Sequence, residues 1–139
     1  MGIHPNASSF DRRSDDLREA RLGLWVWAEA IIVDRLLETY ARVLDEAGAV
    51  AMARKHHRLW RALLFDGPAV VQAAADEIDR AASGLGLPGE VADGVDAAIV
   101  EELVDVVTGR FGSSRNALRT SSLVLMSVTS RLGAARSVR

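Results

Sequence analysis

Apolar residues recur at intervals of three or four along almost the whole chain, and this period constrains the fold more than any other feature. The interval matches one face of an α-helix, which has about 3.6 residues per turn. No segment alternates apolar and polar residues as a half-buried β-strand would. With 139 residues, the chain has the size of one domain that can bury a core. The sequence therefore predicts a compact all-α fold.

Glycines, prolines and capping residues divide this pattern into five predicted helices, over residues 16–45, 47–65, 68–83, 90–110 and 115–132. Asp16 and the acid three residues after it have the spacing of a capping box, so the first helix is expected to begin near Asp16. Gly84 and Gly133 are expected to end the third and fifth helices. Residues 1–13 lack an apolar period and are expected to be a loose segment before a single helical domain over residues 14–139.

Composition excludes several classes of protein. Cysteine is absent, which rules out a disulfide framework, a cysteine-ligated zinc or iron–sulfur site and a thiol nucleophile. The N-terminal stretch has no apolar segment after a basic start, so it does not predict a secretory signal. The strongest apolar stretch, residues 22–33, contains Glu29 and is too short to span a bilayer. We therefore expect a cytoplasmic protein that does not enter a membrane.

Charge is segregated along the chain although the net charge is only −2. Residues 66–105 contain ten acids and one arginine, whereas residues 106–139 contain six arginines and no acid. Two interpretations follow: a surface for a protein partner, or a solvated acidic face with the basic C-terminal helix docked near it. The low isoelectric point, near 5.9, argues against nucleic-acid binding.

No group of residues predicts an enzyme or a metal site. His56 and His57 are adjacent on a predicted helix, where neighbouring side chains point about 100° apart and do not chelate one metal well. One interpretation packs one histidine against Met52 and Trp60 and leaves the other near the surface; the other interpretation turns one of them into a ligand cavity. Glu29 either faces the outer side of its helix or is buried with a functional role.

Three segments together match a known family pattern. Residues 32–40 (IVDRLLETY) are an acidic and apolar stretch that ends in Tyr40. Residues 60–67 (WRALLFDG) are similar to the pattern Trp-x-x-Leu-Phe-x-Gly, with one extra residue. Residues 78–87 (IDRAASGLGL) are similar to Ile-Gly-x-x-His followed by Gly-Leu. In this combination the chain resembles the globin-coupled sensors and protoglobins over about residues 15–132, and the resemblance implies a globin-like helical domain.

The resemblance implies a variant without haem. The proximal histidine that holds the iron in that family falls on Ala82, and no histidine follows His57 in the chain. The third helix would then supply no axial ligand. The implied function is a non-catalytic bacterial signalling domain that acts through ligand-dependent or partner-dependent helix packing and self-association. The alternative is a haem-binding gas sensor that uses His56 or His57 as its iron ligand.

Two sets of candidate residues follow from this hypothesis. The candidate ligand pocket consists of Tyr40, His56, His57 and Trp60. Trp25 and Trp27 broaden the apolar stripe of the first helix and are candidates for the seam of a homodimer. A signalling protein is the other expected partner.

Overall fold

Five α-helices account for most of the residues that the computed structural model describes, which are 5–111 and 115–137, and no strand occurs among them. The helices are α1 (Pro5–Ala41), α2 (Glu46–Phe65), α3 (Pro68–Gly84), α4 (Gly89–Phe111) and α5 (Arg115–Ser137). The predicted all-α fold of about five helices is confirmed.

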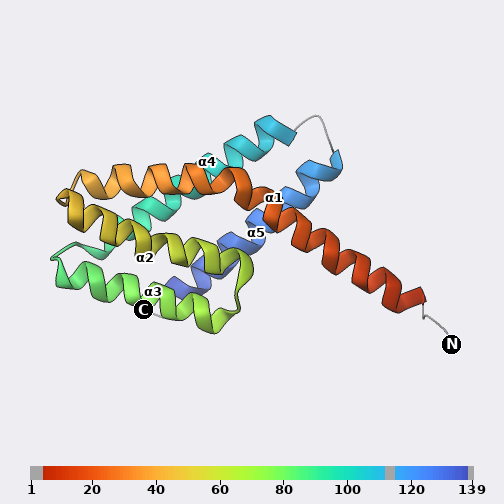
Figure 1. Ribbon diagram of the computed structural model, residues 1–139, viewed down its shortest axis with the longest axis horizontal. Helices are drawn as coiled ribbons and strands as arrows, with labels where there is room; N and C mark the ends of the chain where they lie inside the picture. The colour runs from red at the N-terminus through yellow and green to blue at the C-terminus, as the bar shows by residue number, and fades with distance from the viewer. Residues whose placement is uncertain (1–4, 112–114, 138–139) are drawn as a thin grey trace.

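The helices form a bundle from which part of α1 projects. Figure 1 shows the second half of α1 lying along α2, with α3 on the other side of α2 and with α4 and α5 behind this layer. The first half of α1 leaves the bundle in a different direction. Short connections between α1, α2 and α3 make them antiparallel neighbours, as in other helical hairpins.

The start of the first helix differs from its prediction. The structure extends α1 back to Pro5, so residues 5–13 are helical rather than loose, and the predicted start near Asp16 is wrong. Residues 1–4 lie outside the described part of the chain. Proline fits the first turn of a helix, and no glycine or further proline interrupts the chain between Pro5 and Asp16.

The second helix begins at a capped end. Asp45 is the N-cap of α2, and its carboxylate accepts a hydrogen bond from the Gly48 amide at 2.8 Å.

Two predicted helix ends also need correction. α3 includes Gly84, and the residue with a left-handed backbone is Gly86, at φ 72°. The amide of Leu87 donates to the Ala82 carbonyl at 2.8 Å, which is the hydrogen bond that closes a Schellman motif around Gly86. α5 continues past Gly133 to Ser137. Glycine inside a helix costs about 1 kcal/mol, but this last turn buries a further alanine and brings an arginine against α4, so packing overrides the local preference.

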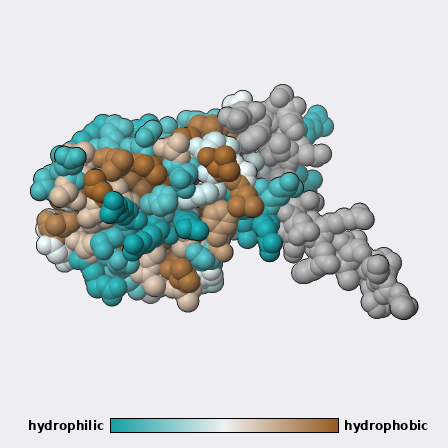
Figure 2. Space-filling view, in the orientation of Figure 1, coloured by the Kyte–Doolittle hydropathy of each residue, from teal (hydrophilic) through white to brown (hydrophobic). Residues whose placement is uncertain are grey.

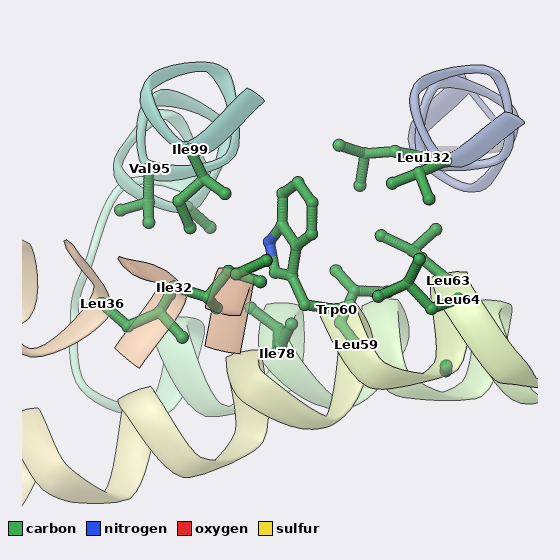
Figure 3. Packing of buried hydrophobic residues seen from close by; sticks show 14 of the residues in the cluster. Ile32, Leu36, Leu59, Trp60, Leu63, Leu64, Ile78, Val95, Ile99 and Leu132 are labelled. Atoms are coloured by element: carbon green, nitrogen blue, oxygen red, sulfur yellow. The ribbon is translucent and has the colours of Figure 1, made fainter. Parts of the chain in front are cut away.

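The core lies where α2 meets the other four helices. Trp60 of α2 is 1% exposed, and Figure 3 shows its indole standing between α4 and α5, beside Ile99 and facing Leu132. Ile32 of α1 and Ile78 of α3 pack beneath it and are almost completely buried. Burial of one such aliphatic side chain contributes roughly 1.5–3 kcal/mol. The centre of α2 is therefore enclosed by side chains from the other helices.

Candidate functional site

A chain of buried hydrogen bonds crosses this core. Tyr40 lies in the last turn of α1, and its hydroxyl oxygen is 2.7 Å from Nδ1 of His56 on α2. The other ring nitrogen, Nε2, lies 2.6 Å from Oδ1 of Asp96 on α4. Tyr40 and His56 are 0% exposed and Asp96 is 2% exposed. Three helices thus supply one polar group each to a site from which water is excluded.

Trp60 joins the same carboxylate. Its indole N–H donates to Asp96 Oδ1 at 2.8 Å. Trp60 follows His56 by four residues, so that both side chains leave α2 on the same face, one turn apart. Asp96 Oδ1 therefore forms hydrogen bonds with both side chains. These hydrogen bonds offset the free-energy cost of burying the polar groups.

Arg136 completes the network from α5. Its guanidinium forms ion pairs with Asp96 Oδ2 and with Asp93 Oδ1 on α4. The side chain of Arg136 is 15% exposed, against 49% for that of Asp93. The pair with Asp96 is therefore largely desolvated, and the guanidinium balances a carboxylate that would otherwise be costly to bury. The expectation that a basic C-terminal helix docks near the acidic segment is confirmed at this point.

The surroundings of Tyr40 determine its protonation state at neutral pH. The pKa of Tyr40 is raised from 10 to about 12. Burial of the hydroxyl raises it, and the positive charge of Arg136 offsets part of this rise. The hydroxyl therefore keeps its proton at neutral pH. Each ring nitrogen of His56 has one hydrogen-bond partner, Nδ1 with the Tyr40 hydroxyl and Nε2 with Asp96 Oδ1. Asp96 Oδ1 is thus shared by His56 and Trp60, and Asp96 Oδ2 forms the ion pair with Arg136. We call Tyr40, His56, Trp60, Asp96 and Arg136 the buried network.

His57 is not part of the buried network. It points about 100° away from His56 around α2. Its ring is 5.2 Å from that of Trp25, and its Nε2 is 3.6 Å from the Glu29 carboxylate. The side chains of His57 and Glu29 are 30% and 46% exposed. The structure therefore brings Tyr40, His56 and Trp60 together but does not bring His57 to them. Of the two interpretations of the adjacent histidines, the one with a core histidine and a surface histidine describes the structure.

The candidate seam residues are only half-buried. Trp25 and Trp27 pack against the edge of the core, and the Trp25 ring meets that of Phe65 edge-on, with ring centroids 5.9 Å apart. Val26 lies between the two tryptophans in sequence and is 78% exposed. The exposed apolar group of this segment is thus Val26 rather than either indole.

Asp96 and Arg136 are the network residues that the sequence analysis did not single out. Both nevertheless occupy positions in an apolar register: Asp96 falls between the buried residues Ala92 and Ile99, and Arg136 follows Leu132 by four. An acid within the apolar register of the fourth predicted helix was the available signal for Asp96. The signal was hidden for Arg136, because the predicted fifth helix ended at Gly133.

Comparisons with known proteins give no further information about this site. No family model, no curated protein and no solved structure matched the chain. Over the described residues, no helix combines the length and apolar composition needed to cross a membrane. Among the same residues, no three histidine, aspartate or glutamate side chains are grouped as a metal site would require.

Proposed function

We propose that this chain is a non-enzymatic, cytoplasmic regulatory domain that acts through helix packing and self-association and holds no haem. The observation that carries the proposal is the buried network. Its tyrosine, histidine and carboxylate are the residues most suited to chemistry, and they are bonded to one another inside the core. Groups in that arrangement position helices rather than substrates.

The network gives helix packing a means of changing state. It joins α1, α2, α4 and α5, so a shift of α4 against α2 separates Asp96 from both His56 and Trp60. Buried hydrogen bonds of this kind strongly favour one arrangement, because each broken bond leaves a desolvated polar group. A partner that binds the shifted arrangement better would move the equilibrium.

Two residues support the proposal that the domain holds no haem. Ala82, where the family resemblance would put the iron ligand, is 5% exposed and carries only a methyl group. Both ring nitrogens of His56 are engaged with Tyr40 and Asp96. Iron ligation by His56 would therefore break the network, and His57 is the histidine left for the alternative haem-binding function.

A haemin titration followed by absorbance distinguishes these functions. We expect no sharp, stoichiometric Soret band. A saturating band that is lost in His56→Ala or His57→Ala would replace the proposal with the gas sensor.

Self-association is supported by exposed apolar side chains on two faces. Val26 on α1 is 78% exposed, and Met126 on α5 is 67% exposed. Met126 lines an apolar groove of about 600 Å³ between α4 and α5, together with Val104, which is 46% exposed. Apolar groups gathered at such a surface are typical of protein contacts.

Sedimentation velocity over a concentration series tests the association. We expect a concentration-dependent dimer that Val26→Glu or Met126→Glu weakens, and the variant with the larger effect identifies the seam. Val70→Glu is the matched control, because Val70 is 51% exposed on α3, away from both faces. Trp25→Ala and Trp27→Ala are expected to weaken association too, but both also remove packing from the core edge. A chain that stays monomeric at high micromolar concentration would contradict self-association.

A further inference from the structure

A groove follows the outer side of the contact between α1 and α2. It has a volume of about 590 Å³ and lies on the side of α2 that carries His57, outside the buried network. Its apolar surface is formed by Val33, Leu37 and Val50, and the buried Leu36 and Ala53 also line it. Figure 2 shows hydrophobic side chains gathered over the second half of α1 and hydrophilic side chains beside them over α2. The groove is thus an apolar trough with one polar edge.

Three arginines form that edge. Arg54, Arg58 and Arg61 follow one another along α2 at intervals of four and three residues, and all three line the groove. This spacing puts them on one face, about one helical turn apart. Arg58 is 68% exposed and lies 3.8 Å from Glu77, a weak surface pair. The one acid that lines the groove, Glu29, is next to His57, so the edge presents an excess of positive charge.

The dimensions of the groove match those of a helix. Its lining extends from Glu29 to Leu37 on α1 and from Val50 to Arg61 on α2. At about 1.5 Å per residue, these spans are about 12 and 16 Å, or roughly two to three helical turns. Both walls are helices whose backbone groups are bonded internally. A ligand segment can form no main-chain ladder here and must satisfy its own backbone, as a helix does.

We propose that this groove binds an acidic amphipathic helix of a partner protein. The apolar stripe of that helix would lie on Val33 and Leu37, and acidic residues one turn apart would pair with the three arginines. Charge complementarity selects this occupant, since a basic helix would be repelled along the whole edge. The proposal rests on the regulatory role proposed above and names the chemistry of its partner.

The test uses a defined probe. A fluorescein-labelled peptide of about 18 residues, with leucine at helical spacing and glutamate on the other face, is long enough to form a helix when bound. Two control peptides replace glutamate with lysine, or keep the composition but alternate leucine and glutamate. Fluorescence anisotropy should show binding of the acidic helical peptide that is at least about tenfold tighter than that of either control.

Variants then locate the binding. The triple variant Arg54→Glu, Arg58→Glu, Arg61→Glu should lose the acidic peptide and gain the lysine peptide, and Leu37→Gln should weaken both. Arg80→Glu reverses an exposed arginine on α3 outside the groove and should bind as the wild type does, and Arg58→Glu alone, with the same change of net charge, should weaken binding of the acidic peptide. Circular dichroism checks that each variant is folded.

Three results would overturn the proposal: no binding of the acidic peptide, equal binding of all peptides, or binding unaffected by the triple variant. If the triple variant instead loses self-association, the groove belongs to a second copy and the proposal is wrong. Sedimentation of the same proteins separates this failure from that of the proposed function, because association through Val26 or Met126 does not need the arginines.

Discussion

His56 and His57 are neighbours in sequence and lie in opposite environments. His56 is fully buried and hydrogen-bonded through both ring nitrogens, whereas His57 lines an open groove and meets a half-exposed glutamate. The 100° step between adjacent helical residues is enough to carry one ring into the core and the other to the surface. One side of α2 therefore holds the helices together, and the other side is available to a partner.

The largest expected effect is on the core side, at Asp96. Asp96→Ala should lower the free energy of unfolding by about 3–5 kcal/mol, because it removes the acceptor of His56 and Trp60 and the buried partner of Arg136. Urea denaturation measures the change. Asp93→Ala is the control, since Asp93 also binds Arg136 but is half-exposed; we expect a loss of about 0–1 kcal/mol. Equal losses at the two positions would mean that burial of the pair contributes nothing.

The second-largest expected effect is the difference between His56→Ala and His57→Ala in the free energy of unfolding. His56→Ala should cost roughly 2–4 kcal/mol, through a cavity and the unsatisfied groups of Tyr40 and Asp96. His57→Ala should cost less than about 1 kcal/mol, because its contacts with Trp25 and Glu29 are at the surface. The same urea experiment measures both, with tryptophan fluorescence as the signal. A reversal of this order would show that the assignment of the two sides is wrong.

The third effect is confined to high pH. Tyr40 is the only tyrosine of the chain, so its ionisation can be followed by the absorbance of tyrosinate. Because the folded-state pKa is raised from 10 to about 12, the folded state holds the proton more tightly than the unfolded state. The resulting stability is fully present below pH 10 and is lost as the pH rises from 10 to about 12.

Tyr40→Phe should remove the loss of stability between pH 10 and about 12 and leave the pH dependence below pH 10 unchanged. A tyrosine that titrates near 10 in the folded protein would contradict its burial beside His56.

Helix positions were predictable because they depend on local signals. The apolar period, the Asp-Gly-Pro break before α3 and the short loops between helices placed the helices to within a few residues, except at the two ends of the chain. The error at the start of α1 arose because the residues before Asp16 contain no helix breaker, and the error at the end of α5 arose because packing overrides a local signal. A capping-box spacing at Asp16 did not begin a helix, and Gly133 did not end one.

The candidate site was only partly predictable for the same reason. Tyr40, His56 and Trp60 are predicted together as part of a ligand pocket, and the structure brings their side chains together inside the core. His57 was grouped with them only because it is adjacent in sequence. The partner that organises all three, Asp96, comes from a helix distant in sequence, within a segment whose acids looked like a solvated face.

The sequence by itself determined the helical class, the apolar stripes and the segregation of charge, since each follows from residue type and a period of about 3.6. Only the tertiary structure decided which polar groups meet. Pairing His56 with Asp96, and Asp96 with Arg136, depends on how α2, α4 and α5 cross, and crossing is set by the packing of whole side-chain surfaces. The same packing left the arginines of α2 beside an open apolar groove, and no local pattern specifies that arrangement.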